Sequence, residues 1–490
     1  MGLMLCLVQC GGAASAKTIE ETEASTGETS GEADAPIEDV AAVEPEPEAD
    51  FEEPSIALGV EDPKEKKIVR KTEAVERRAA DRLAGEREAS KIDSIPKLAR
   101  LRDAAAGKTL EVPEGALRHF YGVLEPLASG QPEPAEPHVV RVLHVGDSFI
   151  GQDVFPDAIR RRMQRRFGDA GPGFQLVDIH HRANIHRGIA LKSAHFRTCF
   201  VRNKCLGAEH GRYGYGGHVS KGGPGASSWL EPRNADAFAS GKGHVEVWYQ
   251  KHPRGGTLQV ELGEHHERLE TRAAKTKDAW TTIPLGPEAA SLKLKALSPG
   301  TVRAYGVVFE TGESGVVWDS TPHTGTFANR VLAQDAEHFA QQIAHREVDL
   351  LVYNFGGNDI RRVAKGNLGR ATLAEELGEA IALYRSGRPQ MSCLVVSSTD
   401  HAKSAGTPVT PKHMRAVVAA QRDAALAQGC AFFDSIAVFG GPGKAERLAT
   451  GKHALVGSDL SHLSSLGREL LAEVFVAELV RNMGRAHATP

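Results

Sequence analysis

The sequence predicts an α/β protein with a parallel sheet that is interrupted by an antiparallel β-sandwich module. Three observations lead to this prediction. Short apolar runs typical of buried strands alternate with segments of helical spacing, at 142–145, 348–353, 393–398 and 430–434. The block 228–312 instead alternates apolar and polar residues, with turn residues such as Gly255-Gly256 between its segments. Helix–strand alternation returns after residue 329, so the β-rich block is interpreted as an insert in an α/β domain.

The segments between the apolar runs have the spacing of helices. After the first strand, Pro156 suits a first helical turn, and Ile159, Met163 and Phe167 continue at helical spacing. Further helices are expected at 331–346, 372–386, 411–428 and about 466–483. A parallel sheet built in this way is covered by helices on both faces.

A chain of 490 residues is too long for one ordinary core, so several domains are expected. No apolar run approaches the ~18 residues that are needed to cross a bilayer. We expect six parts, which are a leader at 1–16, an acidic tether at 17–66, a helical or linker region at 67–135, the first part of the α/β domain at 136–225, the insert at 226–315 and the second part of the α/β domain at 316–486.

The start of the chain indicates export from a bacterial cell. Residues 1–16 are apolar and end in small residues, as in a secretory signal, although a basic start is lacking. The run Leu-Val-Gln-Cys-Gly resembles a lipoprotein cleavage box, with Cys10 as the lipid-bearing residue; the alternative is a chance cysteine. Residues 18–63 contain 16 acids and no Lys or Arg, which indicates a solvated tether. We therefore expect a periplasmic or outer-envelope protein, with a lipoprotein as one form of it.

Charge and cysteine usage bear on the partners of the protein. Residues 18–63 carry a charge of −16, so the formal net charge of −4 leaves +12 on the rest of the chain, which suits an anionic polymer. No Lys/Arg block is dense enough to indicate nucleic acid. Cys199 and Cys205 lie six apart in a loop and could form a local disulfide in an exported protein, whereas in the cytosol they would stay thiols. Cys393 and Cys430 are interpreted as small residues of the core.

Gly146-Asp147-Ser148 follows the first predicted strand and precedes a predicted helix. A serine at such a turn exposes its hydroxyl at the carboxyl end of a parallel sheet, where α/β proteins place their sites. The backbone N–H groups at the start of the following helix can stabilise a developing negative charge. Taken alone, the same residues also suit an ordinary βα turn.

Two further motifs follow later strands of the predicted sheet. Gly356-Gly357-Asn358-Asp359 comes after strand 348–353, and the Asn358 amide is a neutral donor that suits an oxyanion. Asp459 and His462, spaced i, i+3 before the last helix, can bring a carboxylate to one nitrogen of the imidazole. The alternatives are a turn for the first motif, and a helix cap with a surface histidine for the second.

Together, Gly-Asp-Ser, Gly-x-Asn-Asp and Asp-x-x-His resemble the first, third and fifth sequence blocks of the SGNH (GDSL) hydrolase superfamily, in the same order. The resemblance implies a flavodoxin-like three-layer α/β/α sandwich. It implies Ser148 as nucleophile, His462 as general base and acid, and Asp459 as the residue that orients His462. It also implies an oxyanion hole of the Ser148 N–H, a glycine N–H and the Asn358 side chain.

The second block, which supplies that glycine, is the least clear of the family's motifs in this chain. Gly325 follows a plausible strand and is our first choice, with Gly217 as the rival. No metal site is expected, because the loop histidines His180, His181, His186 and His195 lack close ligand spacing and nearby carboxylates. No cofactor is expected either, since no nucleotide-binding fingerprint is present.

The Phe167–Phe174 glycine-punctuated loop and the β-rich insert are similar to bacterial envelope members of the family, which include peptidoglycan and exopolysaccharide O-acetylesterases. This similarity implies an acetylated polysaccharide as substrate and a carbohydrate-binding insert. Trp248, Tyr249 and Trp280 would stack on sugars if exposed, but the alternation places most of them in the sandwich core. The alternatives are an O-acetyltransferase, a lipase- or thioesterase-like esterase, and a non-catalytic wall-binding protein. The sequence leaves the oligomeric state open.

Overall fold

The computed structural model of the chain describes residues 92–129, 136–202, 211–286, 291–297 and 299–486. The predicted leader with Cys10, the acidic tether and Cys205 lie outside the described residues. No helix of the described part is long and apolar enough to pass through a bilayer.

A six-stranded sheet forms the centre of the α/β domain, and it has the order β1-β19-β16-β15-β2-β14. Its strands are β1 (Leu110–Glu111), β2 (Val139–Gly146), β14 (Gly315–Pro322), β15 (Leu350–Asn354), β16 (Ser392–Val396) and β19 (Ala431–Phe433). All neighbours are parallel except β1, which pairs with β19 in the antiparallel sense. Numbered along the chain, the five parallel strands run 2-1-3-4-5, the order of flavodoxin-like sheets.

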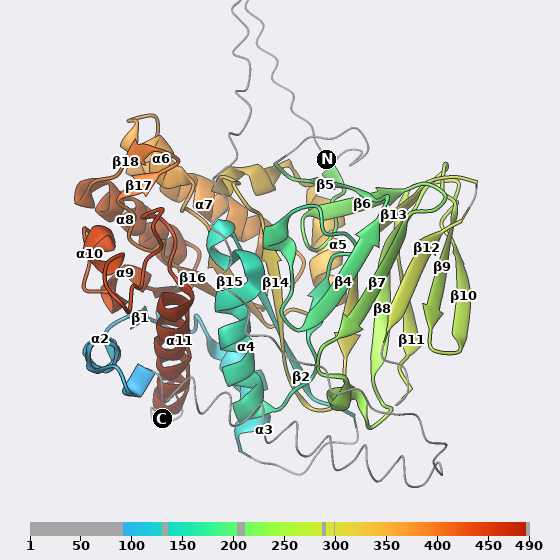
Figure 1. Cartoon of the computed structure of the whole chain (residues 1–490), viewed down its shortest axis with the longest axis horizontal. Helices are drawn as coiled ribbons and strands as arrows, with labels where there is room; N and C mark the ends of the chain where they lie inside the picture. The colour runs from blue at the N-terminus through green and yellow to red at the C-terminus, as the bar shows by residue number, and fades with distance from the viewer. Residues whose placement is uncertain (1–91, 130–135, 203–210, 287–290, 298, 487–490) are drawn as a thin grey trace, which may run out of the picture. The chain divides into compact units, whose positions relative to one another are not determined.

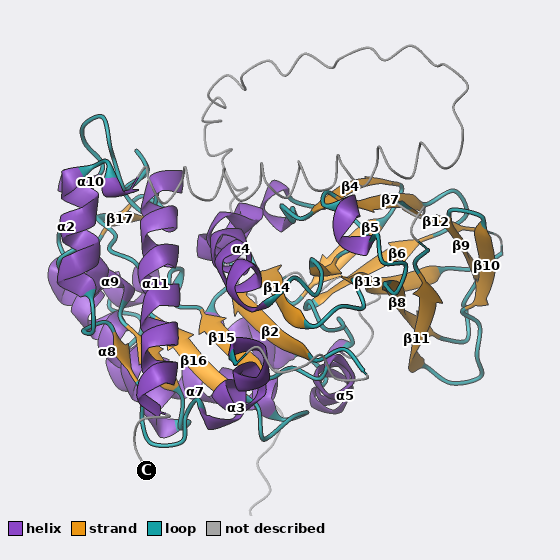
Figure 2. Ribbon diagram, turned by 90° about the horizontal axis from the view of Figure 1, so that it is seen from below, coloured by secondary structure: helices purple, strands orange, loops and turns teal. Residues whose placement is uncertain are grey.

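Helices cover both faces of this sheet (Figure 2). Val140 and Val142 of β2 belong to one core and Leu143 and Val145 to the other, because successive side chains of a strand point to opposite faces. The first core contains α2 (Pro96–Ala105), α3 (Arg118–Ala128), α4 (Val154–Phe167) and α11 (Ser465–Ala486). The second contains α5 (Ala336–Arg346), α7 (Arg370–Arg385) and α8 (Pro411–Ala427). The three-layer arrangement agrees with the prediction.

Short elements connect these helices and strands. They are η1 (Ser148–Asp153), η2 (Arg182–Asn184), η4 (Ala235–Phe238), η5 (Ala328–Ala333), α6 (Asp359–Ala364), β17 (Lys403–Ser404), β18 (Thr407–Pro408), α9 (Ser435–Val438) and α10 (Ala445–Leu448).

The insert is an antiparallel β-sandwich (Figure 1). One sheet has the order β10-β9-β12-β7-β4 and the other β11-β8-β13-β6-β5, with β3 also paired to β13. The strands are β3 (Gly173–Gln175), β4 (Ile189–Ala194), β5 (Arg197–Phe200), β6 (His218–Gly222), β7 (Ser227–Pro232), β8 (His244–Lys251), β9 (Thr257–Leu262), β10 (His265–Glu270), β11 (Lys277–Pro284), β12 (Leu292–Ala296) and β13 (Val302–Glu310). Apolar side chains from both sheets form its core.

The sandwich starts earlier in the chain than expected. Residues 136–225 were predicted to belong to the α/β domain, with the insert at 226–315, but β3 to β6 already lie in the two sandwich sheets. These strands are short and separated by glycine-rich loops, so their alternation is weak. The α/β domain also starts earlier than expected. From Ile92 onward, the predicted linker 67–135 contributes α2, β1 and α3, which contribute residues to the core of this domain or a strand to its sheet.

A buried network of charged side chains joins the sandwich to the α/β domain. Arg346 of α5 donates to Glu310 of β13 (Nη1–Oε1, 2.5 Å) and to Asp319 of β14 (Nε–Oδ2, 2.8 Å). Arg141 of β2 also donates to Glu310, and the Tyr215 hydroxyl donates to Asp319. Because removing one partner would leave a buried charge unpaired, this network fixes the insert against the sheet.

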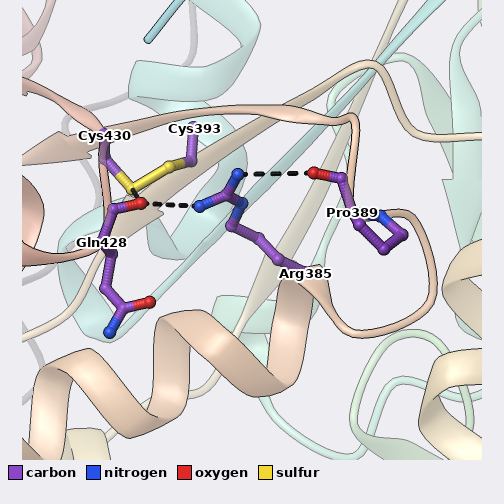
Figure 3. Close-up of a disulfide and its surroundings, with 5 residues drawn as sticks. All are labelled: Arg385, Pro389, Cys393, Gln428 and Cys430. Carbon is purple, nitrogen blue, oxygen red and sulfur yellow. Dashed lines mark hydrogen bonds between the residues drawn. A yellow bond between two sulfur atoms is a disulfide. The ribbon is translucent and has the colours of Figure 1, made fainter. Parts of the chain in front are cut away.

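Cys393 and Cys430 are buried in the core, as expected, and they also form a disulfide, which the sequence analysis did not predict (Figure 3). The reason lies in strand register. Leu394 of β16 pairs with Ala431 of β19, which places the preceding cysteines side by side, with Cα atoms 4.8 Å apart. Disulfides of this kind persist in oxidising compartments.

Candidate active site

Ser148 lies where the first parallel strand of the sheet ends and η1 begins. Gly146 at the end of β2 lets this strand approach β15 closely, since a Cβ there would lie 2.6 Å from the Asn354 backbone oxygen. Asp147 caps η1 by accepting a hydrogen bond from the Phe149 N–H (3.0 Å). Ser148 is the first residue of η1, so its N–H is one of the donors that a helix start leaves unpaired.

The structure brings Ser148, His462 and Asp459 together, as expected. The Ser148 Oγ is 2.9 Å from the His462 Nε2, and the His462 Nδ1 is 2.6 Å from the Asp459 Oδ2. The second carboxylate oxygen of Asp459 accepts the N–H groups of Ser461 and His462 (3.0 Å each), which fixes the loop. Asp459 and His462 remain partly exposed, so the hydroxyl, the imidazole and the carboxylate form an accessible relay.

The charge state of Asp459 suits this relay. Partial burial raises the pKa of Asp459, but the hydrogen bonds from the His462 side chain and from the His462 and Ser461 N–H groups hold it well below its usual range. The carboxylate therefore stays ionised at neutral pH. With the Nδ1–H directed at that carboxylate, the Nε2 is left to accept a proton from Ser148.

Asn358 is held beside both the serine turn and the Gly325 loop. The N–H of the neighbouring Gly357 donates to the Asp147 carboxylate (2.8 Å), which ties this motif to the serine turn. The Asn358 Nδ2 donates to the Thr326 oxygen (3.2 Å), directly after Gly325. Since an amide carries two N–H bonds, the second remains for another acceptor.

Two carboxylates that the sequence analysis left without a role brace these loops. Asp147 joins Phe149 to Gly357, and burial raises its pKa. Asp359 accepts from the Ala328 N–H (3.1 Å) and from Arg362 (2.9 Å), and burial raises its pKa to about 6. Both residues stand inside the motifs quoted for the site, which is the signal that could have singled them out.

The two candidate glycines differ in what their backbone does. Gly325 has a positive φ of 69° at the third position of a turn closed by the Thr326 N–H and the His323 oxygen (3.2 Å). Its N–H donates to no group in the described residues. The Gly217 N–H, in contrast, donates to the Gly214 oxygen (2.9 Å). The Gly217 Cα also packs on the His323 ring, which leaves no room for a Cβ.

Among solved structures, a peptidoglycan O-acetylesterase aligns with 77% of this chain and 99% of its own, at 18% identity and a TM-score of 0.62. This chain has the fold of that esterase. The fold resemblance predicted from the three motifs is therefore confirmed. No protein-family model and no curated protein matches the sequence.

Two weaker structural similarities cover less of this chain. A family two carbohydrate esterase from Clostridium thermocellum aligns with 54% of this chain and 95% of its own, at 12% identity. A lipase/acylhydrolase from Enterococcus faecalis aligns with 35% of this chain and 77% of its own, at 20% identity. Both have a TM-score of 0.25, which is too low to support an argument.

A buried histidine beside the site makes stability depend on pH. Burial lowers the pKa of His323 to about 3, whereas an unfolded chain has a histidine pKa of about 6.5. Between these values the unfolded state binds the proton, so stability falls as the pH falls. From pH 7 to pH 5 we expect His323 to account for a loss of about 2 kcal/mol. Urea unfolding at both pH values should show a smaller loss for His323→Gln, and an equal loss in both proteins would contradict this assignment.

Proposed function

We propose that this protein is a serine esterase that removes acyl groups through a covalent intermediate on Ser148. The observation that carries the proposal is the relay of Ser148, His462 and Asp459 at the carboxyl edge of the parallel sheet, with hydrogen-bond distances of 2.9 and 2.6 Å. A serine, a base and an orienting carboxylate in this sequence of contacts are the parts of a Ser-His-Asp triad.

In the proposed mechanism, the Ser148 Oγ attacks the ester carbonyl while the His462 Nε2 takes its proton. The negative oxygen of the tetrahedral intermediate accepts hydrogen bonds from the Ser148 N–H, the Gly325 N–H and the Asn358 amide. The C–O bond to the alcohol breaks, and His462 returns the proton to the departing oxygen. Water, deprotonated by His462, then attacks the acyl-serine and releases the acid and free Ser148.

Gly325 is the preferred glycine of the oxyanion hole, and two observations support this choice. Its loop follows β14, which neighbours β2, the strand that precedes Ser148, and is joined to Asn358 through Thr326. Its N–H is unused in the described residues, whereas that of Gly217 is engaged by Gly214.

The proposed substrate is an O-acetylated polysaccharide of the bacterial envelope. The fold shared with a peptidoglycan O-acetylesterase over 77% of this chain supports this substrate class. The Cys393–Cys430 disulfide supports export, since cytosolic proteins rarely keep such bonds. We propose a periplasmic or outer-envelope location, with Cys10 as the residue that would carry a lipid anchor.

Replacing Asn358 by alanine tests the oxyanion hole. We expect kcat for an aryl acetate to fall by about 10²–10³-fold, because one donor to the negative oxygen is lost. KM should change little, since the donor acts mainly in the transition state. Steady-state kinetics check this, with Asn367→Ala as the control. A kcat within threefold of wild type would exclude Asn358 from the oxyanion hole.

Acetate release from O-acetylated peptidoglycan tests the substrate class, with an aryl acetate and an aryl octanoate measured alongside. We expect release from the polymer, cleavage of the aryl acetate and no cleavage of the octanoate. Cleavage of both aryl esters without release from the polymer would indicate a general esterase instead. Silence on all three esters, with the polymer still bound, would overturn the esterase proposal.

A further inference from the structure

Arg202 of the sandwich lies against the glycine of the proposed oxyanion hole. It follows β5 and is exposed, and its Nη1 is 2.6 Å from the position that a Cβ on Gly325 would occupy. In the described residues its guanidinium makes no hydrogen bond and no ion pair. A free cation therefore stands within reach of any group bound beside Gly325.

Arg182 and Arg187 approach the serine turn from another loop of the insert. This loop lies on η1, since the Arg187 N–H donates to the Asp153 carboxylate (2.8 Å) and its Nε donates to the Gln152 oxygen (3.3 Å). Arg182 begins η2, whose Ala183 packs directly on Gly151. Both arginine side chains are exposed, and neither has a carboxylate partner in the part of the chain that the structure describes.

Arg468 extends this group of cations from the α/β domain. It lies on α11, six residues after His462, and only 8% of its surface is exposed. Its Nε is buried without a hydrogen-bond partner, and its guanidinium forms no ion pair among the described residues. Burial lowers the pKa of Arg468 to about 10. The nearby charge of Arg187 adds to this lowering, and that of Asp459 opposes it.

The unpaired state of Arg468 contrasts with that of two other buried arginines, Arg160 and Arg346. Arg160 is paired with Asp153 (2.9 Å), and Arg346 is paired with Asp319 (2.8 Å). Burying a cation without a partner is costly, so an unpaired one beside a site is a candidate for holding a ligand anion.

The aromatic residues of the insert offer no comparable contact. Tyr249 is buried in the sandwich core, whereas Trp248 is buried on the other face of β8, in the core that contains α5. The expectation that most of these aromatic residues lie in the sandwich core is therefore wrong, because successive residues of a strand point to opposite faces. Trp280 stacks on the His345 ring at a centroid distance of 4.0 Å. Sugar stacking on Trp248 and Tyr249 is therefore blocked and one face of the Trp280 ring is covered, whereas the insert places exposed arginines near the serine turn.

We propose that Arg182, Arg187, Arg202 and Arg468, here called the arginine rim, bind carboxylate groups of the substrate. This inference rests on the proposed esterase function and narrows its substrate to acetylated glycans that carry carboxylates. Guanidinium groups bind carboxylates in a bidentate geometry, so a carboxylate next to the acetylated sugar would place the ester at Ser148. The carboxylate can stand on the sugar ring or on a side chain of the glycan.

Three chemically O-acetylated polymers test the arginine rim. Polygalacturonate carries carboxylates on its rings, peptidoglycan strands carry them on side chains, and dextran carries none. The measured quantity is the ratio of kcat/KM on each anionic polymer to kcat/KM on dextran. For Arg187→Gln combined with Arg202→Gln we expect this ratio to fall about 10- to 100-fold, as for lost hydrogen bonds to a charged group. A fall on polygalacturonate would indicate a carboxylate on the sugar ring, and a fall on peptidoglycan would indicate a carboxylate on a side chain of the glycan.

The control variant is Arg268→Gln, because Arg268 is equally exposed but lies on β10, at the edge of its sheet opposite β4. Arg468→Gln should lower the ratio and Arg468→Lys should lower it less; if the buried variants fail to fold, the exposed double variant still decides. A wild-type preference for dextran, or an unchanged ratio in the double variant, would overturn the inference alone. If the wild-type protein cleaved none of the esters in a Ser148-dependent way, the proposed function itself would be overturned.

Discussion

Replacing Ser148 by alanine is expected to lower kcat for an aryl acetate by about 10⁶-fold, the largest effect of any single change proposed for this chain. The side chain that would attack the carbonyl is removed, and its only hydrogen bond in the described residues is to the His462 Nε2 (2.9 Å). The fold should be unaffected, because the Ser148 hydroxyl makes no other hydrogen bond there. Single-turnover kinetics at high enzyme concentration can detect the residual rate.

Ser465→Ala is a matched control, since Ser465 is an exposed serine near the same loop at the start of α11. It should retain wild-type activity. If Ser148→Ala cleaved aryl acetate within tenfold of wild type, another nucleophile or a direct attack by water would have to be considered. An equal thermal unfolding midpoint in the two variants would show that the loss is chemical.

Replacing Asp459 by asparagine is expected to lower kcat by about 10⁴-fold. The side-chain oxygen of the asparagine can still accept the N–H groups of Ser461 and His462, so the loop is retained. The new amide donates, however, where the carboxylate accepted from the His462 Nδ1 (2.6 Å). The imidazole is then forced into the tautomer with hydrogen on the Nε2, which cannot accept the Ser148 proton.

The control for this change is Asp335→Asn, since Asp335 caps α5 by accepting from the His338 N–H and lies away from the relay. Its activity should equal that of wild type. A pH–rate profile of Asp459→Asn tests the tautomer argument, because a wrong tautomer lowers the rate at all pH values. Recovery of the rate at high pH would contradict the tautomer argument.

The positions of the relay and of Asn358 could be predicted from the sequence because each stands beside a structural landmark. Ser148 comes two residues after β2, and Asn358 comes shortly after β15, which neighbours β2 in the sheet. Asp459 and His462 precede the last helix. In a parallel sheet these positions converge whatever the lengths of the connections. Both helical layers follow from the alternation of strands and helices, whereas the flavodoxin-like arrangement was implied by the resemblance to the SGNH superfamily.

Other features depend on packing between segments that are distant in sequence. The Cys393–Cys430 pairing follows only from the register of β16 against β19. The early start of the sandwich was not predicted from the sequence because β3 to β6 are short. The positions of Arg202 and Arg468 depend on how the insert and the last helix pack near the serine turn. No local sequence pattern predicts these positions.

The most direct test of the central claim is covalent labelling with an organophosphonate that reacts with activated serines, followed by peptide mass spectrometry. We predict one adduct per chain, on the peptide that contains Ser148, with activity lost in proportion to labelling. The adduct should be absent from His462→Ala, whose serine lacks a base. Full labelling at another residue, or esterase activity that survives complete labelling of Ser148, would contradict the account.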